Sequence, residues 1–183
     1  ITLNVTQNSL ISINLSADTN NTPIKIVSGT WDTTIIATTS LIGNINYPSN
    51  DTIITIYGDV REFHCNNNNT KITGIDVSQN VALCSLSCYT NQLTSLDISK
   101  NTALTTLYCY SNQLTSLDVS KNVALRYLYC YSNPLTSLDV SKNTSLYTLS
   151  CYSNPLTSLD VSKNTALIEL YCYNNNLTSL NVI

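Results

Sequence analysis

Seven cysteines and a single histidine, His64, are the residues of this 183-residue chain whose types could hold a metal ion or form disulfides. Six of the cysteines recur at one step of 23 residues and four steps of 21 residues, at Cys65, Cys88, Cys109, Cys130, Cys151 and Cys172. No two cysteines have the CxxC spacing of a zinc site. The constant step predicts a ladder of small buried side chains. Their Cα atoms would come within disulfide range, but parallel Cβ vectors suit that bond poorly. We therefore expect free thiols, no metal and no cofactor, and at Cys84, outside the ladder, a tolerated substitution rather than a redox group.

A row of aspartates is the other candidate for chemistry. It comprises Asp76, Asp97, Asp118, Asp139 and Asp160, with Asn181 next, and lysines follow three residues on at Lys100, Lys121, Lys142 and Lys163. Stacked carboxylates suit Ca²⁺, but they repel one another by roughly 1 kcal/mol per neighbour in a water-like dielectric. The lysines favour a solvated, charge-compensated face, and a bound cation stays the alternative. A periodic row is not the asymmetric cluster that catalysis needs, so we predict no enzyme.

A 21-residue repeat must position all of these side chains. Leu104–Asn122 has the sequence LTTLYCYSNQLTSLDVSKN, and Leu125–Asn143 has LRYLYCYSNPLTSLDVSKN. Within the first copy Leu107 and Cys109 are two residues apart, so they point to one side of a strand and the flanking tyrosines point to the other. Each half-repeat is too short to bury its apolar side alone. Coils stacked at about 4.8 Å would share a continuous core of leucine, cysteine and valine ladders.

Two series of asparagines share the period of the repeat. One series is Asn91, Asn112, Asn133, Asn154 and Asn175, and the other is Asn80, Asn101, Asn122, Asn143 and Asn164. At a tight bend the backbone leaves N–H and C=O groups unpaired, and a buried amide can bond to them. We expect both series to form structural ladders at the bends.

The first 58 residues do not repeat. Turn residues separate short alternating segments that predict strands at 1–5, 10–16, 23–27, 33–37, 42–47 and 53–57. An open solenoid end exposes apolar side chains and strand edges, so we expect residues 1–58 to form a small β cap domain and residues 59–183 to form the solenoid. We expect Trp31 to pack either in a core or between the two domains. The far end has no matching cap, which predicts either that a C-terminal part was removed or that copies associate end to end.

The pattern LxxLxCxxNxL, repeated six times from Asp59 to Ile183, resembles the core of leucine-rich repeats. The 21-residue length, with a second half that echoes the first, is similar to the nested-repeat type of bacterial internalin-like and Bacteroidetes surface proteins. The resemblance implies an all-β-rich solenoid of about six coils with parallel short strands. It also implies a secreted or cell-surface bacterial protein that binds through its strand face. A chain that starts at Ile1 and contains no Met agrees with removal of an export signal.

Composition excludes two classes of partner. The formal net charge is −3 and charged residues make up 10% of the chain, so the basic footprint of a nucleic-acid-binding protein is missing. No apolar stretch approaches about 18 residues, so we predict no membrane span.

The outward positions of the first half-repeat vary from coil to coil, whereas those of the second half are nearly constant. The variable face is rich in tyrosine, which offers a rigid ring and a polar tip at little entropic cost. We therefore predict binding at Tyr108, Arg126, Tyr127, Tyr129, Tyr147 and Tyr171, with the irregular tyrosines and the arginine forming a patch on the middle coils. The constant tyrosines either stack on one another or bind a ligand, and both roles stay open for Tyr89, Tyr110, Tyr131, Tyr152 and Tyr173.

A protein partner is the ligand that this face favours. A carbohydrate is the alternative, because aromatic rings stack on sugars and the face is nearly uncharged, although the array lacks tryptophan. A structural stalk or a self-assembling subunit is the third hypothesis, suggested by the near-identical coils.

Overall fold

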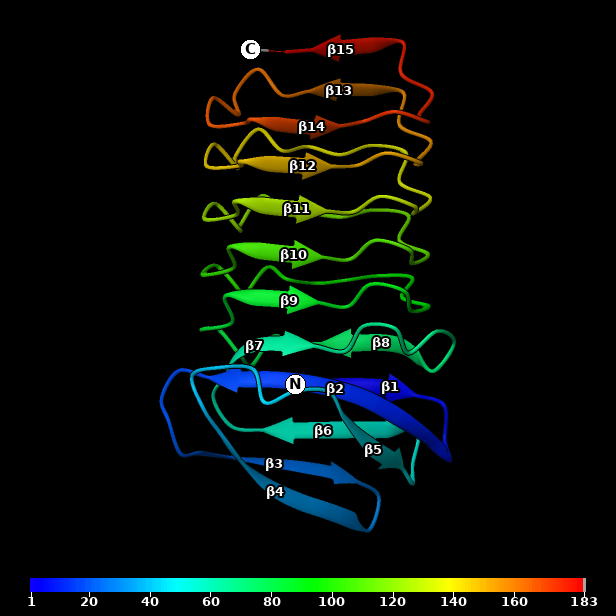
Figure 1. The fold of residues 1–183 in the computed structure, drawn as a ribbon. Coiled ribbons are helices and arrows are strands. Elements are labelled where there is room, and N and C mark those ends of the chain that lie inside the picture. Colours follow the sequence, from blue (N-terminus) through cyan, green and yellow to red (C-terminus); the bar gives the residue numbers. More distant parts are fainter. Residues whose placement is uncertain (183) are drawn as a thin grey trace.

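The computed structural model describes residues 1–182, and over that range it contains strands and no helix (Figure 1). Six parallel strands form a ladder along one face of a solenoid: β7 (Val60–His64), β9 (Ser85–Ser87), β10 (Thr106–Tyr108), β11 (Tyr127–Tyr129), β12 (Thr148–Ser150) and β14 (Glu169–Tyr171). They pair in register, so that leucines 86, 107, 128, 149 and 170 are aligned. The coils thus stack without offset, as the 21-residue step predicts, and the chain is a β-solenoid of about six turns.

The second half of each coil forms the opposite side of the solenoid. It is extended as β8 (Ile72–Asp76), β13 (Ser158–Asp160) and β15 (Ser179–Asn181), of which β13 and β15 pair in parallel. In the coils between, this half forms no regular strand, but its side chains still alternate between the core and the solvent. Leu117 and Val119 are buried while Asp118 is exposed, as the alternation predicts.

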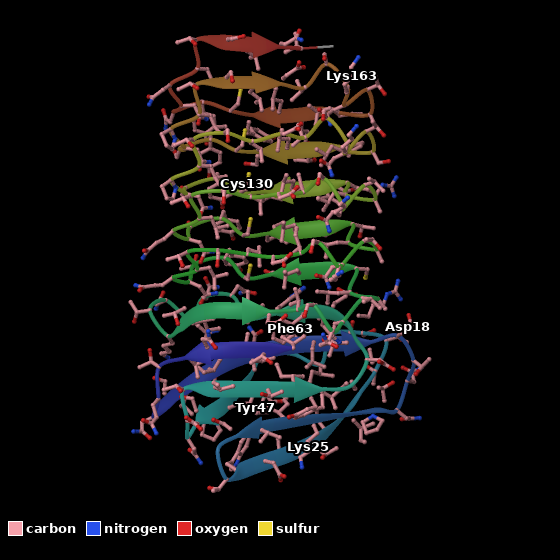
Figure 2. The ribbon with its side chains drawn as sticks, turned by 180° about the vertical axis from the view of Figure 1, so that it is seen from behind. Asp18, Lys25, Tyr47, Phe63, Cys130 and Lys163 are labelled. Atoms are coloured by element: carbon pink, nitrogen blue, oxygen red, sulfur yellow. The ribbon has the colours of Figure 1, made fainter. Side chains whose placement is uncertain are left out.

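The N-terminal segment covers the apolar end of the first coil. Its strands are β1 (Thr2–Val5), β2 (Ser9–Ala17), β3 (Thr22–Ser28), β4 (Trp31–Ala37), β5 (Ile45–Ser49) and β6 (Ile53–Tyr57). Strand β2 pairs antiparallel with β7, and β1 pairs antiparallel with β8, so both strands of the first coil continue into sheets of this segment. Phe63, fully buried, lies where the segment meets the coils (Figure 2).

The predicted strands of this segment are confirmed to within three residues at each end. The largest shift is at β5, which begins at Ile45 rather than Ile42, because Gly43 adopts a φ of 91° and the chain turns there. Trp31 is partly buried and lies 6.1 Å from Tyr47 between ring centroids, so of the two predicted positions it takes the one in a core, within this segment. One apolar cluster runs from this segment into the coils, and the domain boundary at residue 58 stays a prediction.

The first asparagine ladder is confirmed at the bend after each strand. Asn133, for example, donates through Nδ2 to the carbonyls of Cys109 and Cys130 at 3.1 and 3.0 Å, and its Oδ1 accepts the backbone N–H of Leu114 at 3.0 Å. Each amide therefore ties its own coil to the preceding one. The residue before most of these asparagines, such as Ser111, Ser132 or Ser153, has a left-handed φ of 54°, which sharpens the bend.

In the second ladder four of the five amides use only their donor half, and Asn80, the first, also accepts from the N-terminal ammonium group of Ile1 at 3.1 Å. Asn122 donates through Nδ2 to the carbonyls of Ile98 and Asn101 at 3.0 and 2.9 Å. Its buried Oδ1 has no hydrogen-bond partner among residues 1–182, and the same holds for Asn101, Asn143 and Asn164. The two ladders thus contribute unequally to the solenoid.

The cysteine ladder is confirmed as a column of free thiols. All seven cysteines of the described chain are unpaired, and five of the six in the ladder are buried. Burial raises the pKa of Cys88 and of Cys151 to about 12, because the thiolate would lose its solvation. These thiols therefore act as small core side chains (Figure 2).

Candidate functional site

The constant tyrosine column is a continuous aromatic stack. Neighbouring rings of Tyr89, Tyr110, Tyr131, Tyr152 and Tyr173 lie 4.2–4.4 Å apart between centroids, with interplanar angles of 9–11°. Burial among these rings raises the pKa of Tyr110 and of Tyr131 to about 12. Stacking is therefore a role that this column has in the fold. We call it the tyrosine column.

The irregular tyrosines do not all meet in one patch. Tyr108 and Tyr129 stack on each other at 4.8 Å, on positions that are aligned in β10 and β11. Tyr171 on β14 is separated from Tyr129 by one coil, in which Ser150 occupies the aligned position. The predicted set is thus divided along the axis, with Tyr171 and Tyr173 exposed on the last coil.

The middle coils carry the open part of this face. The rings of Tyr127 and Tyr147 lie 6.0 Å apart, tilted by 57°, and these residues are 37% and 41% exposed. Exposed Arg126 directly precedes Tyr127 and lies one coil before Tyr147 in the same column. We call Arg126, Tyr127 and Tyr147 the open patch. It presents two rings and a guanidinium that the core does not require.

A hollow of about 560 Å³ lies where the N-terminal segment meets the strand face. Its lining comprises Asn14, Asn44, His64, Asn66, Ser87, Tyr89, Tyr108, Tyr110, Tyr129 and Tyr131. We call it the junction hollow. Desolvation by burial lowers the pKa of His64, and its Nε2 atom has no hydrogen-bond partner in the described chain. The hollow is therefore lined by uncharged side chains at neutral pH.

Sequence reasoning missed Asn14 and Asn44 as members of this hollow. Asn14 comes from β2, opposite His64 in the antiparallel pair with β7, and Asn44 comes from the loop before β5. No short-range signal reports that pairing, because residues 14 and 64 are far apart in the sequence. The predicted tyrosines 108, 110, 129 and 131 are brought together here.

The aspartate row has a local structural role. Each Asp from Asp76 to Asp160 accepts, through Oδ1, the backbone N–H of the serine two residues on, at 2.8–2.9 Å. These hydrogen bonds lower the pKa of each carboxyl group. Across residues 1–182 no three His, Cys, Asp or Glu side chains are grouped so that they could hold a metal ion. The row thus closes Asx turns, which explains why it is constant.

Cys84 lies beside Arg61 at the edge of the strand face. Its Sγ atom is 3.4 Å from the arginine Nε, and the residue is half-buried. It occupies the position held by Thr105 and Arg126 in later coils.

Parallel strands in register, 21-residue coils and asparagine ladders together define the class: the chain is a leucine-rich-repeat β-solenoid. It is similar to the functional domain of InlJ from Listeria monocytogenes, which includes a cysteine ladder. The two share 38% identity at a TM-score of 0.60, over 67% of this chain and 29% of that one. The chain is also similar in fold to the LRR protein LIC12759 of Leptospira interrogans, with 23% identity and a TM-score of 0.52 over 58% of this chain and 33% of that one.

The chain thus spans about a third or less of the length of both relatives. No family model matches the chain, and no curated protein matches it. No helix in the described residues is long and apolar enough to cross a membrane.

Proposed function

We propose that this chain is a recognition module, secreted or displayed on a bacterial surface, that binds a protein partner through its strand face. The observation that carries the proposal is the open patch. Tyr127 and Tyr147 stay 37% and 41% exposed although coils flank them on both sides, and Arg126 lies beside them. Tyrosine and arginine are the side chains most often found at the energetic centre of protein interfaces.

The contrast between the two faces supports this proposal. On the aspartate face the outward aspartate recurs from coil to coil, and its role in an Asx turn accounts for it. On the strand face the aligned residues Ser85, Tyr127 and Glu169 differ in size and charge, while the backbone pairing is the same. The fold does not explain this variation, and recognition of a partner does.

The rigid scaffold would lower the cost of binding. Strands β10, β11 and β12 pair in register beneath the patch, and the tyrosine column stacks beside it. Side chains that are already ordered lose less entropy when a partner docks. Similarity to the InlJ domain supports a surface recognition role, because 38% of aligned residues are identical.

We propose a binding role and not an enzymatic one. His64, the single histidine, has no hydrogen-bond partner at Nε2 within the described residues, so no nucleophile is paired with it there. The regular aspartates are each held in a turn.

The test is a binding screen of the purified chain against extracellular-matrix and cell-surface proteins by biolayer interferometry. The double variant Tyr127→Ser/Tyr147→Ser should weaken a specific interaction at least about tenfold, since interface hot spots each contribute about 2 kcal/mol or more. Tyr57→Ser is the control, because Tyr57 is an even more exposed tyrosine, at 57%, but lies at the end of β6, away from the strand face. Equal binding by wild type and the double variant would contradict the proposal.

A further inference from the structure

Two aromatic stacks end at the junction hollow. In one, Tyr108 stacks on Tyr129, and the aligned position before Tyr108 is held by Ser87. In the other, the tyrosine column starts at Tyr89, and the position before it is held by Asn66. Because the rings stack from coil to coil, their faces look along the solenoid axis. The first ring of each stack therefore has no aromatic partner on the side of the hollow.

Polar groups surround these two rings. Asn14 Oδ1 accepts the N–H of Gly43 at 3.0 Å, and Asn66 Oδ1 accepts the hydroxyl of Ser87 at 3.2 Å. Within residues 1–182 the Nδ2 groups of these two asparagines donate to no protein acceptor, and the Nε2 atom of His64 is likewise unpartnered. The hollow thus offers hydrogen-bonding groups at the rim of ring faces.

The lining and its size restrict the ligand. A hollow of about 560 Å³ is within the range of small-molecule sites, which is roughly 300–1,000 Å³. Its lining holds no aliphatic side chain and no Lys, Arg, Asp or Glu. A charged ligand would find no counter-charge. An aromatic or proline side chain of a peptide would cover the ring faces but leave the amides without partners.

We propose that the junction hollow binds a neutral sugar ring. One face of a pyranose presents C–H groups with partial positive charge, which lie favourably against the electron-rich face of an aromatic ring. The sugar takes the place of the missing ring in front of Tyr108 or Tyr89, and its hydroxyls bond to the side chains of Asn14, Asn44 and Asn66. This site is separate from the open patch and goes beyond the proposed protein recognition.

The variant Ser87→Tyr tests this site directly. It extends the Tyr108 stack by one ring into the space of the sugar, and the fold already holds tyrosines at that position in β10 and β11. Ser150→Tyr is the matched control. Ser150 has the aligned position in β12 and is 2% exposed, against 3% for Ser87, but it does not line the hollow.

The experiment is a titration of the isotope-labelled chain, followed by NMR, with methyl glycosides of glucose, galactose and N-acetylglucosamine and with their disaccharides. At least one neutral sugar should shift resonances of Asn14, Asn44 or His64 and saturate. Ser87→Tyr should weaken that binding at least about tenfold, while Ser150→Tyr and Tyr127→Ser/Tyr147→Ser leave it unchanged. Asn44→Ala, at an exposed loop residue, should weaken it severalfold without altering the fold.

Three results would overturn the proposal. The first is that no neutral sugar produces a saturating shift in the folded wild type. The second is that Ser87→Tyr, shown to be folded by its spectrum, binds as well as wild type. The third is that a charged sugar such as glucuronate, or a proline-rich peptide, binds in the hollow more tightly than every neutral sugar.

Discussion

Replacing Asn133 by alanine should destabilise the solenoid more than the same change at Asn122. The side chain of Asn133 makes bonds at both ends, to the carbonyls of Cys109 and Cys130 and from the N–H of Leu114. Each carbonyl also accepts from an asparagine of an adjacent coil and so keeps a partner. The N–H of Leu114 has no other acceptor in the described chain, and it would be left buried and unpaired.

Asn122 is in a different position. Its Nδ2 group donates to the carbonyls of Ile98 and Asn101, and these also accept backbone N–H groups, from Asn101 and Leu104. Its Oδ1 atom is buried without a partner. Alanine at this position therefore removes two bonds and leaves no new unpaired group.

The difference follows from the cost of one unpaired donor. A net hydrogen bond contributes about 0.5–1.5 kcal/mol, and a buried group left unsatisfied costs about 1–3 kcal/mol. We expect Asn122→Ala to lower the free energy of unfolding by about 1–3 kcal/mol, and Asn133→Ala to lower it by about 2–6 kcal/mol.

Urea unfolding followed by far-ultraviolet circular dichroism measures both values on the same scale. The two variants remove the same atoms at buried positions of neighbouring bends, so each controls for the other. Equal losses, or a larger loss for Asn122→Ala, would refute the argument that the unpaired N–H of Leu114 makes the loss of Asn133 the more costly of the two.

Three further predictions concern titratable groups. Under native conditions a thiol reagent at pH 8 should modify Cys84 and Cys172 but not the five buried cysteines, and fast modification of all seven in the folded chain would contradict the ladder. Absorbance at 295 nm should show Tyr110 and Tyr131 ionising near pH 12, and stability should fall as pH rises from 10 to 12, because the unfolded tyrosines lose their protons first. Because the pKa of His64 is lowered in the folded chain, the unfolded chain takes up a proton first below pH 6.5, and stability should fall as the pH drops from 6.5. In thermal unfolding His64→Gln should reduce this fall. An unchanged dependence of stability on pH in the variant would contradict a desolvated imidazole.

The repeat could be predicted from the sequence because its signal recurs in register. The step between Cys109 and Cys130 gives the length of one coil, and the alternation around Leu107 indicates which side chains are buried. The Asx turns are also a local pattern, since an aspartate followed two residues on by serine is a known turn former. That pattern accounts for the aspartate row without a bound cation.

The junction hollow could not be predicted in the same way. It depends on the antiparallel pairing of β2 with β7, which places Asn14 opposite His64. Such a pairing joins segments that share no periodicity, so the sequence does not set its register. The division of the tyrosines also depends on neighbours across coils, because the aligned Ser150 separates Tyr129 from Tyr171. The binding role of these tyrosines stays a prediction.

The coils are interchangeable units, since their ladder bonds have nearly the same lengths in each turn. Excision of residues 146–166 would join residue 145 to residue 167 and bring Asn175 to the N–H of Leu135 in place of Asn154. The shortened chain would lose Tyr147 from the open patch but keep every residue that lines the hollow. In-frame gain or loss of 21-residue units can therefore alter the reach of the molecule and its outer contacts while the end nearest the N-terminus stays as it is. The length of the solenoid and the lining of the junction hollow can thus evolve separately in this architecture.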